Sequence, residues 1–499
     1  PLINLLRSND IDVQESAAGA LRNLSENDQN KIRIVQEGAL AWLVPLLRTP
    51  SLKVLEQLLM VLWNLSINPD NKIRMVEKGC LPPVIALLKS AEERIQELAV
   101  GTIRNLSVEH DNKTRIVQEG GLSPLIALLK SPVVNILQHA AASLRNLSVR
   151  EGNDVKIAME GGLGPLIALL SHPSTEVQLH AAGAVRNLSV NDENKVKIAR
   201  DVGLRPLIEL LSSTVVEIQE QTVIALRNLC ANAENQIKLV QEGALPPLIN
   251  LLRSNDIDVQ ESAAGALRNL SENDQNKIRI VQEGALAWLV PLLRTPSLKV
   301  LEQLLMVLWN LSINPDNKIR MVEKGCLPPV IALLKSAEER IQELAVGTIR
   351  NLSVEHDNKT RIVQEGGLSP LIALLKSPVV NILQHAAASL RNLSVREGND
   401  VKIAMEGGLG PLIALLSHPS TEVQLHAAGA VRNLSVNDEN KVKIARDVGL
   451  RPLIELLSST VVEIQEQTVI ALRNLCANAE NQIKLVQEGA LPPLINLLR

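Results

Sequence analysis

The sequence contains very few aromatic residues. Among its 499 residues it has no Phe and no Tyr, and its tryptophans are Trp42, Trp63, Trp288 and Trp309. Aromatic side chains dominate the cores of most globular domains. A core of Leu, Ile, Val and Ala instead favours thin layers of closely spaced helices, as in a solenoid of repeats.

Charge excess, cysteine and long apolar runs are also scarce. The formal net charge is −3, which gives no bulk attraction to nucleic acid or to an anionic membrane. The four cysteines are too few for a disulfide framework and lack metal-ligand spacing. No secretory signal opens the chain, and no apolar run reaches the roughly 18 residues of a membrane span. We therefore expect a cytoplasmic protein without a nucleic-acid partner or a membrane span.

Motifs for catalysis are missing as well. The sequence has no glycine-rich phosphate loop, no nucleophile elbow and no His-Glu-x-x-His. His139 and His180 share a repeat phase, but neighbouring helices lie about 8–10 Å apart and no cysteine or carboxylate completes a metal site. We interpret both as satisfied surface or groove histidines. The prediction is no catalytic residue, no metal and no cofactor.

What the sequence does contain is a repeat of 41 residues. Asn-Leu-Ser or Asn-Leu-Cys recurs at this spacing twelve times, which matches repeats of two or three helices. A longer period lies over it, because residues 1–253 recur unchanged as 247–499. We divide the chain into 1–246, six repeats, and 247–499, the same unit plus the start of a further repeat. Recent tandem duplication and deliberate design both remain open.

Local signals predict three helices in each repeat. Asn30 is suited to capping a short first helix that Gly38 ends. A second helix opens at the proline of most repeats, such as Pro83. A third runs from about Val13 to Ser25, with apolar residues three and four apart. Where Trp42 replaces that proline, Pro45 follows three residues later and should shift the start of the helix.

The repeat resembles the armadillo repeat over the whole chain. The residues that carry the likeness are Asn-Lys-Ile-x-Ile-Val-x-x-Gly-Gly-Leu-x-Pro-Leu-Ile-x-Leu-Leu, followed by Val-Gln-x-x-Ala-Ala-x-Ala-Leu-Arg-Asn-Leu-Ser. The sequence is most similar to catenin-like, yeast vacuolar and plant U-box armadillo repeats. The resemblance implies an all-α, right-handed superhelix of about twelve repeats whose third helices line a concave groove. It also implies a non-enzymatic scaffold for protein–protein interaction.

One asparagine per repeat is the main candidate for ligand binding. An amide offers a donor and an acceptor together, so it can bind the backbone of an extended peptide, and the resemblance assigns this role to the repeated asparagine. The alternative is that each asparagine caps or bridges the end of its own helix. These residues form the Asn ladder: Asn23, Asn64, Asn105, Asn146, Asn187, Asn228, Asn269, Asn310, Asn351, Asn392, Asn433 and Asn474.

An arginine precedes most of these asparagines, and Trp63 interrupts the series. In catenin-like proteins such arginines receive acidic extended partners, and a guanidinium matches a carboxylate in geometry. The alternative is that each arginine pairs with a Glu of the next repeat. These residues form the Arg ladder: Arg22, Arg104, Arg145, Arg186, Arg227, Arg268, Arg350, Arg391, Arg432 and Arg473.

Two further expectations concern tryptophan and the chain ends. Trp42 and Trp63, with their copies Trp288 and Trp309, mark where a partner would dock once per unit; alternatively, Trp42 fills a gap in the core. Both ends of the sequence fall inside a repeat, which suggests a window on a longer array. An alternative function is therefore a segment of an elastic cytoskeletal filament, with end-to-end self-association or continuation into further repeats.

Overall fold

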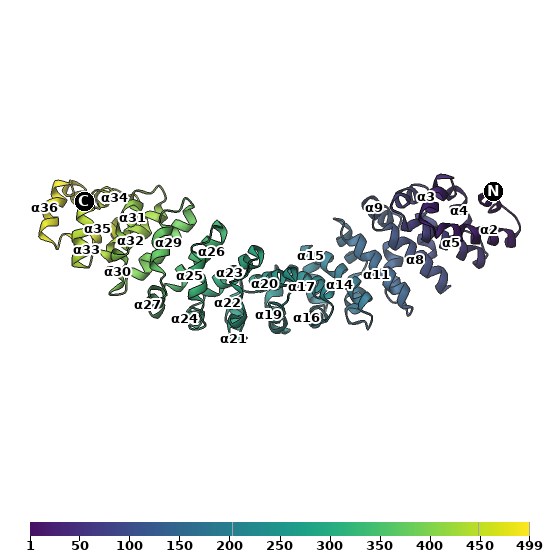
Figure 1. Cartoon of the computed structure of the whole chain (residues 1–499), viewed down its shortest axis with the longest axis horizontal. Coiled ribbons are helices and arrows are strands. Elements are labelled where there is room, and N and C mark those ends of the chain that lie inside the picture. The colour runs from purple at the N-terminus through teal and green to yellow at the C-terminus, as the bar shows by residue number, and fades with distance from the viewer. Residues whose placement is uncertain (202, 448, 499) are drawn as a thin grey trace. The chain divides into compact units, whose positions relative to one another are not determined.

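The computed structural model describes residues 1–201, 203–447 and 449–498. Within them the regular secondary structure is entirely helical, without a strand. The chain divides into two compact units, Pro1–Leu251 and Leu252–Arg499. Each unit is a succession of three-helix repeats (Figure 1). Among the described helices none is long and apolar enough to cross a membrane.

In the first unit, each repeat has a short first helix, a short second helix and a longer third helix. The first helices are α3 (Asp28–Gln36), α6 (Pro69–Glu77), α9 (His110–Gln118), α12 (Asn153–Met159), α15 (Asp192–Arg200) and α18 (Ala233–Gln241). The second helices are α1 (Leu2–Leu5), α4 (Leu40–Leu46), α7 (Leu81–Leu87), α10 (Leu122–Leu128), α13 (Leu163–Ala168), α16 (Leu204–Leu210) and α19 (Leu245–Leu251). The third helices are α2 (Ile11–Ser25), α5 (Leu52–Ile67), α8 (Glu93–Leu106), α11 (Val134–Ser148), α14 (Thr175–Leu188) and α17 (Val216–Leu229).

The second unit repeats this order. Its first helices are α21 (Asp274–Gln282), α24 (Pro315–Glu323), α27 (His356–Gln364), α30 (Asn399–Met405), α33 (Asp438–Arg446) and α36 (Ala479–Gln487). Its second helices are α22 (Leu286–Leu292), α25 (Leu327–Leu333), α28 (Leu368–Leu374), α31 (Leu409–Ala414), α34 (Leu450–Leu456) and α37 (Leu491–Asn496). Its third helices are α20 (Ile257–Leu270), α23 (Leu298–Ile313), α26 (Glu339–Leu352), α29 (Val380–Ser394), α32 (Thr421–Leu434) and α35 (Val462–Leu475). Single 3-10 turns, Leu169–Ser171 and Leu415–Ser417, follow α13 and α31.

The third helices form the core of each unit. In the first unit α5, α8, α11 and α14 contact one another in sequence order, side by side (Figure 1). In α8, Ile95, Leu98, Ile103 and Leu106 are all buried. Their spacing places them on one side of the helix, and Gly101 leaves room for the ring of Trp63 from the neighbouring helix. The predicted third helix is confirmed, although α2 begins at Ile11, where Asp10 caps it.

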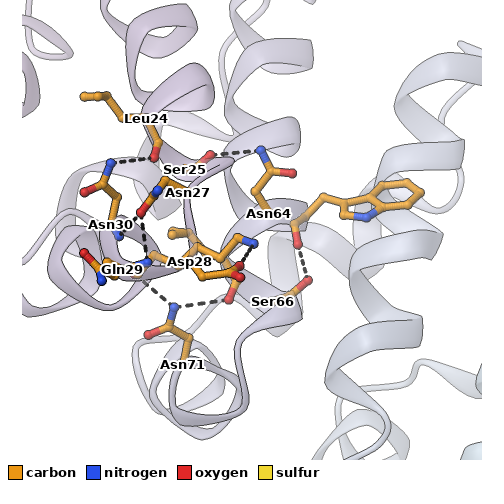
Figure 2. A network of polar contacts seen from close by, with 12 residues as sticks. Leu24, Ser25, Asn27, Asp28, Gln29, Asn30, Asn64, Ser66 and Asn71 are labelled. Atoms are coloured by element: carbon orange, nitrogen blue, oxygen red, sulfur yellow. Dashed lines mark hydrogen bonds and ion pairs between the residues drawn. The ribbon is translucent and has the colours of Figure 1, made fainter.

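The cap predicted for the first helix was wrong. Asn27 is the residue that caps α3, accepting hydrogen bonds from the N–H groups of Gln29 and Asn30. Asn30 lies one turn inside, and its amide donates back to the carbonyl of Leu24 at 3.1 Å (Figure 2). Gly38 ends the helix as predicted, with φ at +82°, a conformation that costs glycine little.

The second helices begin earlier than predicted. α7 starts at Leu81, so Pro83 is its third residue. Proline is tolerated there because the first N–H groups of a helix have no partner within the helix. The predicted shift at Trp42 was also wrong, because α4 starts at Leu40, the same repeat position as Leu81, and Pro45 lies inside it.

In later repeats, the asparagine equivalent to Asn30 has a structural role. The amide of Asn71, which is fully buried, donates to the carbonyls of Leu65 at 3.2 Å and Lys31 at 3.0 Å. Lys31 belongs to the preceding repeat, 40 residues earlier in the chain. Asn112 makes the equivalent pair of bonds. Since buried carbonyls need a partner, Asn71 and Asn112 tie their first helices to the preceding repeat.

Candidate functional site

The Asn ladder lies in the last turn of the third helices. The side-chain amide of Asn64 donates to Ser25 Oγ of the preceding repeat at 2.9 Å (Figure 2). The same bond, between 2.9 and 3.1 Å, is made by Asn105, Asn146, Asn187, Asn228, Asn310, Asn351, Asn392, Asn433 and Asn474. The ladder therefore bridges neighbouring repeats. The alternative that each asparagine serves its own helix end does not describe these positions.

The serine that receives this bond is itself held in place. Ser25 Oγ donates to the carbonyl of Arg22 at 2.6 Å, and Ser66 Oγ donates to that of Trp63. The amide donor of Asn64 is thus used by the fold. Its Oδ1 accepts no hydrogen bond from the described residues, and Asn64 is half-buried. An acceptor therefore remains for a ligand. At the first ladder position, Asn23 Oδ1 accepts from Arg22 instead.

The Arg ladder points along the same surface toward the next repeat. Arg22 Nη1 donates to Gln57 Oε1 at 3.3 Å, and Arg186 Nη1 donates to Gln221 Oε1 at 2.9 Å. Arg104 Nη1 lies 3.1 Å from His139 Nδ1. These partners are neutral, so the alternative, a pairing with a Glu of the next repeat, does not hold at these three positions. Their positive charges remain available on a half-buried surface.

The side chain of Arg145 packs differently from those of the other ladder arginines just described. Its side chain lies flat on Gly183, where a Cβ atom would be 2.5 Å from Arg145 Nε. Burial lowers the pKa of Arg145, the nearby charge of Arg186 lowers it further, and Glu220 opposes the shift. The copies Arg391 and Gly429 show the same packing. We call the surface formed by the Asn ladder, the Arg ladder and their partners the ladder face.

Trp63 takes the ladder position of an arginine. Its ring covers Gly101, where a Cβ atom would lie 2.4 Å from the ring. It also meets the edge of His139, with ring centroids 5.2 Å apart and planes at 83°. Trp309, Gly347 and His385 repeat this arrangement in the second unit. The tryptophan thus forms part of the ladder face.

Trp42 lies elsewhere and does not fill a core gap. It is half-buried, and the guanidinium of Arg7 lies 4.1 Å from the centre of its ring. Its copy Trp288 is 40% exposed and stacks with Arg253. Such a contact between a cation and an aromatic face is favourable at a surface. The alternative that Trp42 is a core residue is therefore wrong.

The histidines of the ladder face are unusual in their surroundings. Burial lowers the pKa of His139 to about 4, and the charge of Arg104 adds to the shift. Burial also lowers the pKa of His180 to about 4, followed by the charges of Arg104 and Arg145. Neither buried ring nitrogen of His180 has a hydrogen-bond partner among the described residues. The interpretation of His180 as a satisfied histidine was wrong, and the repeat phase alone gave no signal of this.

The residues named so far give no metal site. Among the residues that the structure describes, no group of three or more His, Cys, Asp or Glu side chains could hold a metal ion. The four cysteines Cys80, Cys230, Cys326 and Cys476 are free thiols. Burial raises the pKa of Cys80 to about 12, so this thiol stays protonated and unreactive near neutral pH.

These features define an all-α solenoid of three-helix repeats with one continuous ladder face in each unit. A family model described as Armadillo/beta-catenin-like repeat matches residues 1–26, 68–108, 109–149, 152–190, 191–231, 232–272, 314–354, 355–395, 398–436 and 437–477. The chain belongs to the armadillo-repeat family. The matches leave out 27–67 and 273–313, the repeats that contain all four tryptophans. These repeats nevertheless have the usual three helices.

Solved structures support the same fold. An engineered protein is 28% identical, with a TM-score of 0.71, and the match covers 79% of this chain and 98% of that one. A structure concerning a phosphorylation switch that controls the interaction between cadherin and beta-catenin is 20% identical, with a TM-score of 0.80. That match covers 95% of this chain and 98% of that one. No curated protein sequence matches the chain. The armadillo-repeat fold indicates a scaffold for interactions with other proteins.

Proposed function

We propose that the chain is a non-enzymatic scaffold that binds extended, acidic protein segments along the ladder face. The observation that carries the proposal is the run of ladder arginines Arg104, Arg145 and Arg186. They lie in successive repeats on a half-buried surface, and the hydrogen-bond partners of Arg104 and Arg186 are neutral. Their copies Arg350, Arg391 and Arg432 lie in the same setting.

The binding geometry follows from the groups that the fold leaves unused. A backbone N–H of an extended ligand would donate to the Oδ1 of a ladder asparagine. Its acidic side chains would pair with the neighbouring guanidinium groups, as charge-assisted hydrogen bonds are stronger than neutral ones. The solved neighbour concerned with cadherin and beta-catenin supports a protein as the ligand. The cytoplasmic location stays a prediction.

The test compares two sets of Arg→Gln substitutions. The ladder variant changes Arg104, Arg145, Arg186 and their second-unit copies. The control changes Arg33, Arg74, Arg115 and their copies Arg279, Arg320 and Arg361, which lie on the first helices. We expect the ladder variant to bind a labelled 20-residue peptide of alternating Glu and Ser at least about tenfold more weakly, because it loses several charge-assisted hydrogen bonds. Fluorescence anisotropy measures this, with circular dichroism to check helicity.

The control variant should bind within about twofold of the original chain, since exposed charges contribute little. A peptide in which Gln replaces Glu measures the preference for negative charge. Equal binding of the Glu and Gln peptides by the original chain, or equal losses in both variants, would refute the acidic ladder.

A second candidate function is end-to-end association into a filament, and one surface favours it. A cleft of about 530 Å³ at the C-terminal end of the second unit is lined mainly by Val462, Val469, Ile470, Leu494, Ile495, Leu497 and Leu498. Several of these side chains are exposed, Leu498 at 87%. An apolar surface of this kind is typical of an interaction site. We propose that the N-terminal end of a second copy of this chain packs there.

Analytical ultracentrifugation over a concentration series tests this candidate. We expect the sedimentation coefficient to rise with concentration, and Ile495→Glu to abolish the rise because it places a charge in the apolar cleft. The control is Val395→Glu, at a 64% exposed position outside the cleft. A constant sedimentation coefficient, or an equal effect of the control, would contradict self-association through this surface.

A further inference from the structure

The ladder face carries a pocket at the position where tryptophan interrupts the arginines. In the second unit the pocket has a volume of about 210 Å³ and is lined by Met306, Trp309, Asn310, Arg340 and Leu344. Met60, Trp63, Asn64, Arg94 and Leu98 hold the same positions in the first unit. The pocket therefore recurs once in each 246-residue unit as a sequence feature, while the flanking arginines recur in most repeats.

The tryptophan wall of the pocket is fixed before any ligand arrives. Trp309 lies on Gly347, where a Cβ atom would be 2.4 Å from the ring. The edge of His385 meets the ring at 5.2 Å between centroids. Leu344 is 2% exposed and belongs to the core. Preformed apolar walls reduce the ordering cost of binding.

The arginine of the pocket is already paired with two carboxylates. Arg340 forms ion pairs with Glu302 at 3.2 Å and with Glu343 at 3.1 Å. Arg94 makes the corresponding two ion pairs in the first unit. The pocket arginine thus differs from Arg350, whose hydrogen-bond partner His385 is neutral. A carboxylate of the ligand would therefore gain less binding free energy in this pocket than beside Arg350. An apolar side chain of the ligand would displace no unpaired charge there.

Asn310 supplies the polar contact at the rim. Its amide donates to Ser271 Oγ at 2.9 Å and to the carbonyl of Arg268 at 3.3 Å. Its Oδ1 accepts no hydrogen bond from the described residues. A ligand backbone N–H that donates to this oxygen would bring its own side chain next to Trp309 and Met306. The position of the asparagine therefore couples backbone binding to occupation of the pocket.

We propose that the pocket binds one large apolar side chain, such as Leu, Met or Phe, of the extended ligand and thereby sets its register. This inference rests on the proposed function. The acidic residues of the ligand then lie mainly to one side of the apolar residue, opposite Arg350, Arg391 and Arg432. Neighbouring helices pack about 8–10 Å apart and an extended chain rises about 3.3 Å per residue. An acidic residue every two to three positions fits this spacing.

Synthetic peptides test the register directly. The host is the 20-residue Glu/Ser peptide, with one central residue changed to Leu, Phe, Ala or Glu. We expect the Leu and Phe peptides to bind the original chain about tenfold more tightly than the Ala peptide, because a buried apolar side chain contributes in proportion to its area. Trp→Leu substitution of Trp42 and Trp288 leaves the pocket tryptophans as the emitting rings, so their emission should shift with the Leu peptide.

The variant that removes the pocket tryptophans is Trp63→Arg with Trp309→Arg. The fold accommodates arginine at this ladder position, since Arg391 lies on Gly429 as Trp309 lies on Gly347. We expect this variant to lose the tenfold preference for Leu over Ala and to bind the Glu peptide more tightly. The Trp42→Leu, Trp288→Leu variant should keep the preference.

Three outcomes would overturn the inference. The first is that the original chain binds the Leu and Ala peptides equally while it still prefers the Glu/Ser host to its Gln version. This result would refute the apolar pocket and would leave the proposal of an acidic ligand unaffected. An unchanged Leu preference after both Trp→Arg substitutions places the apolar contact elsewhere. If no acidic peptide binds in preference to its Gln version, the proposed function and the inference about the pocket are both refuted.

Discussion

Truncation of Ile249 to Ala should lower the free energy of unfolding by about 2–4 kcal/mol, whereas Ile495→Ala should lower it by less than about 1 kcal/mol. The two residues are copies of each other, because residues 247–499 repeat 1–253. Ile249 is 5% exposed and Ile495 is 50% exposed. Loss of a buried side chain leaves a cavity, but loss of an exposed one does not.

The duplicated sequence makes this comparison unusually well matched. Both substitutions remove the same atoms from the same local sequence, in α19 and α37, so helix propensity cancels. Urea unfolding followed by circular dichroism measures the difference, and hydrogen exchange shows which helices open. Because each solenoid repeat contacts mainly its neighbours, the Ile495 variant should affect exchange only near the C-terminal helices. Equal destabilisation by both substitutions would contradict the burial of the two positions.

The fold could be predicted because its signals are local and repeated. The Leu-rich second helices and the apolar spacing of the third helices recur every 41 residues, so each copy confirms the others. Gly38 could be assigned as a helix end because its positive φ is a local requirement. The cap was misassigned because Asn27 and Asn30 are both suited to that role by residue type. Only a long-range partner, such as the carbonyl that Asn71 reaches in the preceding repeat, separates the two roles.

The ladder face was less predictable because it depends on how successive helices are rotated. The partners of Arg22 and Arg104 lie 35 residues further along the chain, at Gln57 and His139. A polar side chain recurs at this phase, which is a signal that could have suggested the contact. The packing of the Trp63 ring against Gly101 could not be deduced from the sequence spacing, because it depends on the distance between the backbones of two neighbouring helices. The neutral partners of the arginines are what make an acidic ligand the better proposal.

Lowering the pH from 7 to 5 should destabilise the chain through four histidines of the ladder face. Burial is the main cause that lowers the pKa of His139, His180, His385 and His426 to about 4, against about 6.5 in an unfolded chain. The unfolded state therefore binds more protons between these two values. The stability that these four neutral histidines contribute is fully present above about pH 6.5 and is lost as the pH falls toward 4.

The expected loss by pH 5 is about 1 kcal/mol for each half-buried ring, because solvent screening reduces the effect of the pKa shift. Thermal unfolding at a series of pH values measures it. The matched variant changes all four histidines to Gln, which the fold accepts at this position, since Gln57 and Gln221 bind Arg22 and Arg186. This variant should be nearly insensitive to pH between 6.5 and 5, whereas a control with exposed His110 and His356 changed to Gln should keep the dependence. A quadruple variant as sensitive to pH as the original chain would assign the proton uptake to other groups.

Because a bound carboxylate favours the protonated ring, an acidic peptide should reduce the loss of stability at pH 5 in the original chain and not in the Gln variant.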